Sequence, residues 1–367
     1  MKRKLIFVLA LTLLFVMLCG FKVEEPLEIV NEKELKKALS EDTLDVLDQL
    51  GLSDLTPVSL QTLSPSDMLE LIFHSFLRKI KEPFGALLTF LIAGIFCMIL
   101  QSFQEKGSGT DLVYQVCCSL AASSAVLLPL SGMIRSVSAT IRECSDFMLG
   151  FIPVYTSFTA AGGTVVAASG YHTLVIGMTT VISRLISEIA VPLIGIFMAL
   201  CVVGTVSPVN MNGLSHSVKS FILWFLGLLT AVFSGVMGLG TLVSAPLDRI
   251  SGKTLKYIVG SGIPIFGGIA AETLSTVKSC LLLAKNMLGV YAIFVIAAIF
   301  VPPLLTVLTW KIVISVGETV GSFFDNKMLT SLLSGTSTVI GILLALLVMI
   351  FFLFTFSITV LLLCGGA

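Results

Sequence analysis

Two charged residues of opposite sign lie four positions apart inside a long apolar stretch. At this spacing Arg184 and Glu188 share one face of a helix and can form an ion pair. A charged side chain is costly in the centre of a bilayer, and those found there commonly serve a transport path. Alternatively, both residues lie near the lipid headgroups and are solvated. The pair is therefore a candidate membrane site, with both placements open.

Two apolar, glycine-rich stretches each carry a proline after a charged segment. They are LGFIPVYTSFTAAGG, which contains Pro153, and VGSGIPIFGGIAAE, which contains Pro264. Pro192 and Pro303 follow them at equal separations. Proline removes a backbone donor and clashes with the preceding turn, so we expect broken helices at these four positions. Paired broken segments can form the midplane site of a transporter, and simple kinks are the alternative.

The order of segments around these prolines favours an internal duplication. A span, a charged interfacial stretch, an Ile-Pro hairpin and a Pro-broken span occur twice, in residues 112–219 and 223–330. Glu272 follows the second Ile-Pro motif on an amphipathic stretch and is a further candidate position. The prediction is of two related halves within one membrane domain.

Residue types that carry enzymatic chemistry are scattered along the chain. The three histidines form no HExxH motif, and GxSxG and P-loop motifs are absent. The eight cysteines contain no CxxC pair, which argues against a zinc site or a disulfide framework. We therefore expect no enzymatic activity, no cofactor and no metal.

The composition indicates an all-α polytopic membrane protein. Apolar residues make up 56% of the chain, charged residues 12%, and the net charge is zero, so no basic surface suggests nucleic acid binding. Uncharged runs of about 18 residues or more can cross a bilayer as helices, and we expect about 7–8 spans with Pro/Gly-broken segments. The expected spans are 84–103, 112–134, 171–189, 190–207, 220–244, 287–309 and 333–363.

The N-terminal part differs from this membrane domain, which is residues 84–367. Residues 1–20 have a basic start and an apolar core, typical of a signal peptide or an uncleaved signal anchor. Residues 22–83 are acidic and amphipathic, and predict a small extracytoplasmic helical domain that lies on the membrane or on a partner. A solvated linker with nascent helix is the alternative.

Several segments together resemble one known family. LSPSDMLELI, ECSDFMLGFIPVYTSFTAAGG, KTLKYIVGSGIPIFGGIAAET and SCLLLAKNMLGVY are similar to the stage III sporulation protein AE family of endospore-forming Firmicutes, over essentially the whole chain. The resemblance implies an integral component of a channel complex between mother cell and forespore, needed for late forespore gene expression. It also implies the mother cell membrane as location, with residues 22–83 facing the space between the two membranes.

The resemblance implies partners as well. They are the other stage III A sporulation proteins and, through the complex, stage II sporulation protein Q. The apolar spans add the lipid bilayer, and a homo-oligomer stays open. Two other functions remain open from the residues. One is a secondary transporter with a midplane site at the paired broken helices, and the other is a membrane scaffold without a pore.

Overall fold

The fold is a bundle of long helices. The computed structural model describes residues 39–49, 83–89, 92, 95, 111–161, 165–206, 211–262, 267–323 and 327–364, and none of these residues lies in a strand. This confirms the all-α prediction for the described part. The elements are α3 (Glu41–Gln49), α7 (Asp111–Ala161), α8 (Val165–Leu185), the π-helix η1 (Ile186–Ala190), α9 (Val191–Val206), α10 (Asn212–Gly262), α11 (Gly267–Phe323) and α12 (Lys327–Cys364). Residues 83–89 form a further helical segment.

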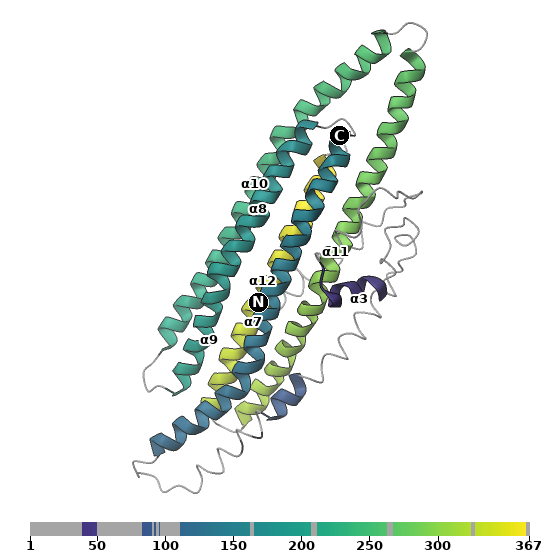
Figure 1. Ribbon diagram of the computed structural model, residues 1–367. Coiled ribbons are helices and arrows are strands. Elements are labelled where there is room, and N and C mark those ends of the chain that lie inside the picture. The colour runs from purple at the N-terminus through teal and green to yellow at the C-terminus, as the bar shows by residue number, and fades with distance from the viewer. Residues whose placement is uncertain are drawn as a thin grey trace.

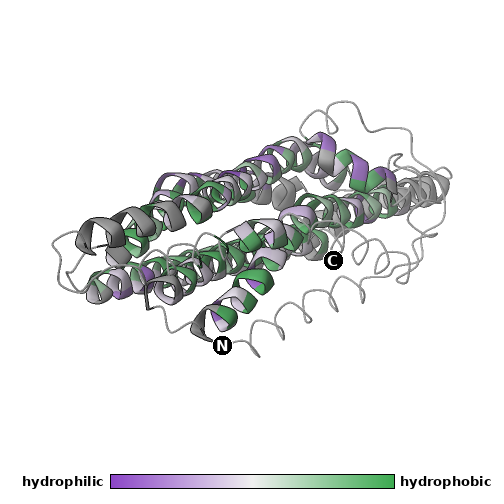
Figure 2. Ribbon diagram, turned by 90° about the horizontal axis from the view of Figure 1, so that it is seen from below, coloured by the Kyte–Doolittle hydropathy of each residue, from purple (hydrophilic) through white to green (hydrophobic). Residues whose placement is uncertain are grey.

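The long helices run nearly parallel to one another. α7 and α12 lie in the middle of the bundle, α8 and α10 lie on one side, and α11 lies on the other, with α3 beside α11 (Figure 1). Apolar positions cover much of each helix, and hydrophilic positions recur among them along the bundle (Figure 2). The buried side chains are mostly apolar, so van der Waals packing between them and bonds between helices hold the bundle together in a membrane.

Four segments among the described residues are long and apolar enough to cross a membrane. They are His172–Gly204, Gly213–Leu239, Leu281–Val320 and Thr330–Leu362. The seven or eight spans expected from the sequence are not confirmed. The expected spans 84–103 and 112–134 fall partly on residues or side chains outside the described part, and so do residues 1–20 and most of 22–83.

The two spans expected at 171–189 and 190–207 are one continuous helical segment, which corrects the prediction of a break at Pro192. The chain passes from α8 through η1 into α9. In η1 the N–H of Val191 donates to the carbonyl of Ile186, five residues back, so the turn is wider than an α-helical turn. A π-bulge just before proline accommodates a residue that cannot donate and whose ring crowds the preceding turn.

Pro153 and Pro303 also lie within helices, which corrects the breaks expected there. α7 continues past Pro153 to Ala161, and α11 contains Pro303 within its length. Near Pro153 the hydroxyls of Thr156 and Ser157 donate to the carbonyls of Ile152 and Pro153, at 2.9 and 2.8 Å. Local hydroxyl bonds of this kind help a proline-containing helix to persist in a membrane.

α11 and α12 form an antiparallel pair joined by two lysines. The Nζ of Lys285 lies 3.5 Å from the carbonyl of Leu362, near the C-terminus of α12. The Nζ of Lys311 lies 2.7 Å from the Oγ of Ser337 and also donates to its carbonyl. Between these lysines, residues 286–310 carry no charge and span about 37 Å as helix, enough for a hydrocarbon core of about 30 Å. The lysines therefore mark the two ends of the charge-free part of the candidate span Leu281–Val320.

α10 and α11 are longer than their apolar segments. Residues 240–262 of α10 and 267–280 of α11 continue beyond the candidate spans, and the two helices project past the C-terminal end of α12 (Figure 1). Glu272 lies in this projecting part of α11, and nothing of its side chain is described. Pro264 lies outside the described residues, so the internal repeat stays a prediction.

Candidate functional site

A polar pocket of about 580 Å³ lies at one end of the bundle, where four elements converge. Its apolar floor comes from Phe197 and Leu200 of α9, together with Met211. Its polar lining comes from α10, α11 and α12: Ser215, His216, Lys219, Glu318, Thr330, Ser331, Ser334 and Thr338. A volume of this size falls within the range of small-molecule sites, although the lining is more polar than is usual for them.

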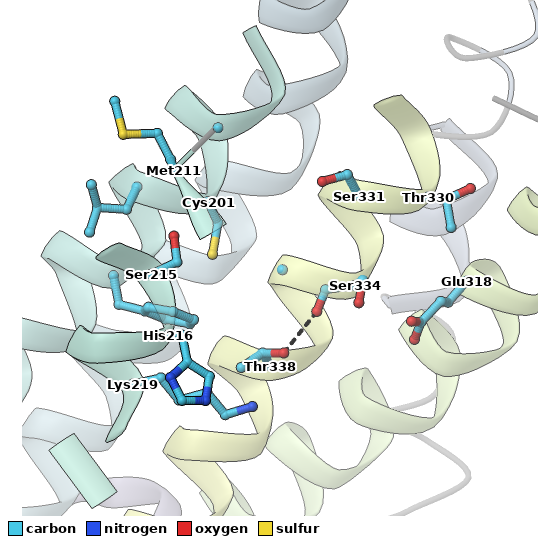
Figure 3. Close-up of a pocket in the computed structure, with 14 residues that line it drawn as sticks. Cys201, Met211, Ser215, His216, Lys219, Glu318, Thr330, Ser331, Ser334 and Thr338 are labelled. Atoms are coloured by element: carbon cyan, nitrogen blue, oxygen red, sulfur yellow. Dashed lines mark hydrogen bonds between the residues drawn. The ribbon is translucent and has the colours of Figure 1, made fainter. Parts of the chain in front are cut away.

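The charged side chains of the pocket lie on different walls. Lys219 and His216 extend from α10, and Glu318 lies on the other side of the α12 hydroxyl groups (Figure 3). The Thr338 hydroxyl donates to the Ser334 carbonyl at 3.0 Å, so it is tied to its own helix (Figure 3). The pocket thus offers a cation, an anion and a row of hydroxyls, which suits a polar solute with groups of both signs.

A close approach of α9 and α12 forms the base of this pocket. A Cβ added at Gly335 would lie 2.9 Å from the Cβ of Cys201, a distance that real Cβ atoms do not show. A side chain at this position would force Cys201 or one of the two helices to shift, so glycine permits the close contact. The contact places the hydroxyls of α12 next to the end of α9.

The pocket lies near the ends of the candidate spans and not at their middle, since Lys219 is near the start of Gly213–Leu239 and Glu318 near the end of Leu281–Val320. Glu318 lies about two turns beyond Lys311 on α11, and Lys311 marks one end of the charge-free stretch. At this depth water can solvate Lys219 and Glu318, so their charges need no buried partner. This position suits an entrance or a docking point for a solute.

The described residues contain no group of three His, Cys, Asp or Glu side chains that could hold a metal ion. Cys144 and Cys201, whose side chains are described, are free thiols. The pocket contains a thiol and an imidazole, Cys201 and His216, and its other lining residues are the charged groups of Lys219 and Glu318, hydroxyls and apolar groups. Its arrangement is suited to binding.

Arg184 and Glu188 lie within the candidate span His172–Gly204, Arg184 at the end of α8 and Glu188 in η1. Both side chains are exposed on the surface of the chain. The expected ion pair between them is not among the contacts of the described residues. Facing lipid at the bilayer centre, each charge would cost about 2.5–3.5 kcal/mol on insertion scales. In a membrane, Arg184 and Glu188 therefore require water or polar protein groups next to the surface on which they are exposed.

The structure does not bring the other predicted positions together with this pair. Pro192 follows η1 and is exposed, Pro303 is buried in α11, and Pro153 lies in α7 on the other side of the α7–α8 turn. None of these three residues lines the polar pocket. The proline positions act on helix geometry and supply no ligand groups.

Sequence reasoning missed two polar residues that the structure makes important, Lys285 and Tyr155. Lys285 belongs to the amphipathic stretch that also carries Glu272, where a surface position is expected, yet this side chain is 1% exposed. The Lys285 ammonium lies 5.7 Å from the centre of the Tyr155 ring, and the Tyr155 hydroxyl donates to the Leu361 carbonyl at 3.1 Å. This cluster joins α7, α11 and α12. The sign of burial in the sequence was the position of Lys285 at the edge of an apolar run.

Comparison with known proteins agrees with these observations. The family model described as stage III sporulation protein AE matches residues 58–365. The chain belongs to the stage III sporulation protein AE family. This confirms the family expected from the sequence motifs, and the match covers every long helix described above.

A curated relative of this family is stage III sporulation protein AE of Bacillus subtilis (strain 168). It is 24% identical to this chain over 310 residues, which cover 83% of this chain and 77% of the relative. No solved structure matches the chain. Members of the family are thus related to this chain through the membrane helices as well as through short motifs.

Proposed function

We propose that this chain is an integral membrane component of the sporulation channel complex that links mother cell and forespore. The observation that carries the proposal is the family match over residues 58–365, which includes all four candidate spans. In the proposed role the protein lies in the mother cell membrane around the forespore. Residues 22–83 then face the space between the two membranes.

The proposed partners are the other stage III A sporulation proteins and, through the complex, stage II sporulation protein Q. α3 supports a binding role for the N-terminal part, because its exposed side carries the carboxylates of Glu41, Asp45 and Asp48. A solvated acidic face is suited to electrostatic recognition of a basic partner surface. In this role the protein takes part in the assembly of the complex and in the passage of molecules through it, and it catalyses no reaction.

Disruption of the gene in its spore-forming host tests this function. Growth, engulfment and late forespore transcription are then scored in the same culture. We expect normal growth and completed engulfment, followed by a forespore that fails in late transcription. Normal late transcription and normal spores would contradict the proposal.

A secondary transporter is the second candidate, favoured by the polar pocket between α9, α10, α11 and α12. Its walls carry Lys219 and Glu318, which could hold a solute with groups of both signs. Disruption would then cause a defect in growing cells tied to one nutrient or ion. Replacing both Arg184 and Glu188 with Gln also separates the two functions. A transporter that uses this pair loses activity, and a docking component retains spore formation.

A further inference from the structure

Contacts between helices show which residues lie at the same position along the bundle axis, and this position is called the height of a residue. The Tyr155 hydroxyl meets the Leu361 carbonyl at one end. Toward the other end, Leu130 lines a small cavity with Leu332 and Thr336. α7 and α12 therefore run in the same direction in constant register. The residues of α7 midway between Leu130 and Tyr155 lie at the middle of the charge-free part of α11 and α12.

Charged residues of α7 and of the α8–η1 segment lie at this middle height. Arg142 and Asp146 of α7 are near the midpoint, and both are exposed. α8 runs antiparallel to α7, and the small cavity that contains Leu127 also contains Met198. This register places Arg184 and Glu188 level with the same part of α7. None of the four makes an ion pair with another residue in the described part of the chain.

α10 presents a different surface at the same height. The polar pocket joins Cys201 of α9 to His216 of α10, and in the antiparallel register from this contact Val232 comes level with Arg184. Val232 and Leu228 are 49% and 44% exposed. One side of the bundle is therefore apolar at mid-height, as a lipid-facing surface is, while α7 and η1 expose charges there.

α3 is a second, independent sign of water at this height. One carboxylate oxygen of Glu143, Oε1, accepts a bond from the Ser40 N–H at 2.8 Å and another from the Thr43 hydroxyl at 2.7 Å. These bonds hold the start of α3 against the middle of α7. The outer side of α3 carries exposed Glu41, Asp45 and Asp48. Such a helix is stable beside a membrane domain only where water reaches it.

We propose that the exposed faces of α7 and η1 line a water-filled path through the membrane domain, with walls completed by further copies of this chain. Arg142, Arg184, Asp146 and Glu188 carry two positive and two negative charges. Equivalent faces of several copies can therefore surround a common space without net repulsion. With the exposed carboxylates of Glu41, Asp45 and Asp48 on α3, this lining carries more negative than positive charges, so the path suits small hydrophilic solutes that are neutral or cationic. α3 lies inside this path, which opens to the side of the membrane that residues 22–83 face.

This inference concerns where water reaches the chain and does not depend on the sporulation role. Accessibility of introduced thiols in membranes measures it without any assay of spore formation. Failure of the gene-disruption experiment would leave it standing, and its own failure would leave the proposed role standing. The two proposals are therefore tested separately.

The test uses single cysteine substitutions in the full-length chain in its host membrane. Ala139→Cys, Arg142→Cys and Arg184→Cys probe the path, and Leu228→Cys and Val232→Cys on α10 are controls at matched height. The probe is a charged, membrane-impermeant methanethiosulfonate, which reacts with thiolates in water. Labelling is measured relative to the unsubstituted chain, so that native cysteines are subtracted. Ala139 is exposed on α7 and uncharged, so Ala139→Cys keeps the test valid if the arginine variants fail to fold.

We expect labelling at the three path positions and none at the two control positions. If the path positions are unlabelled, as the control positions are, the water-filled path is overturned. A thiol–thiol crosslinker with a spacer, applied to Ala139→Cys, then tests the walls. Covalent dimers of the chain are expected. Labelling without crosslinked dimers would overturn the part of the proposal that assigns the walls to further copies.

Discussion

At the scale of single residues, two lysines of α11 are tied to main-chain carbonyls of the neighbouring helix α12. Lys285 approaches the carbonyl of Leu362, and Lys311 donates to the carbonyl and hydroxyl of Ser337. A lysine in this setting avoids the cost of an unsatisfied buried charge. The two lysines thus fix the register of α11 against α12.

Replacement of Lys311 tests this register directly. Lys311→Met should destabilise the fold by about 1.5–3 kcal/mol, the usual contribution of a hydrogen bond to a charged group. Ser337→Ala should cost less, because the ammonium keeps the carbonyl as acceptor. The midpoint of unfolding by sodium dodecyl sulfate in mixed micelles measures both. A larger loss for Ser337→Ala than for Lys311→Met would show that the serine hydroxyl, and not the lysine, matters more.

At the scale of elements, close helix contacts and a side-chain cap position the segments. α9 approaches α12 at Gly335, and Glu143 of α7 caps the start of α3 through Ser40 and Thr43. The wide turn of η1 lets α8 and α9 continue as one helix despite Pro192. These local contacts determine how α9 and α12 lie around the polar pocket. They also determine how α3 lies against α7.

Two glycine substitutions should have effects of opposite sign. Gly335→Ala forces a methyl group against Cys201 and should destabilise by about 1–3 kcal/mol, as overpacking does. Gly195→Ala in α9 meets no atom within 4 Å and should stabilise by about 0.4–1 kcal/mol, because alanine loses less entropy in a helix. Thermal unfolding in detergent compares them. Equal effects would show that α9 and α12 are not in close contact at Gly335.

Removal of the Glu143 carboxylate should release α3. Glu143→Ala leaves the Ser40 N–H and the Thr43 hydroxyl without their shared acceptor, so amide hydrogen exchange in α3 should speed up. Glu143→Gln keeps an oxygen acceptor and should change the exchange less. The control is the exchange of α12, which should be the same in both variants. Unchanged exchange of α3 in Glu143→Ala would mean that apolar contacts alone hold this helix.

At the scale of the whole molecule, the bundle presents two kinds of surface at one height. α10 exposes Leu228 and Val232, whereas α7 and η1 expose Arg142, Asp146 and Glu188. A protein that is apolar on one side and charged on the other at membrane depth needs lipid on the first side and water or protein on the second. The chain therefore couples a membrane anchor to a hydrophilic face.

Deletion of residues 22–83 separates membrane insertion from assembly. The apolar spans should still insert, because they begin beyond the deleted part. Spore formation should fall to the level of the gene disruption, because the proposed partner-binding part is lost. Heat-resistant spore counts and the amount of protein in the membrane fraction are the two measurements. Normal spore counts from the deletion variant would contradict a docking role for these residues.

The sequence by itself determined the helical class, the presence of segments apolar enough to cross a membrane, and the family. Apolar runs such as 287–309 and 333–363 are long enough to span, and they coincide with candidate spans of the structure. Such signals are local, since the length and hydropathy of one segment suffice to predict a spanning helix. The family followed from motifs that are also contiguous in the chain.

Only the tertiary structure decided how residues far apart in the chain come together. Proline restricts its own turn, yet neighbouring bonds and the wide turn of η1 decided that Pro153 and Pro192 lie in unbroken segments. Lys285 looks like a surface lysine until α12 places the carbonyl of Leu362 beside it. The shared height of Arg142 and Arg184 likewise depends on the register of α7 against α8. Register is set by packing between helices, and no single segment contains it.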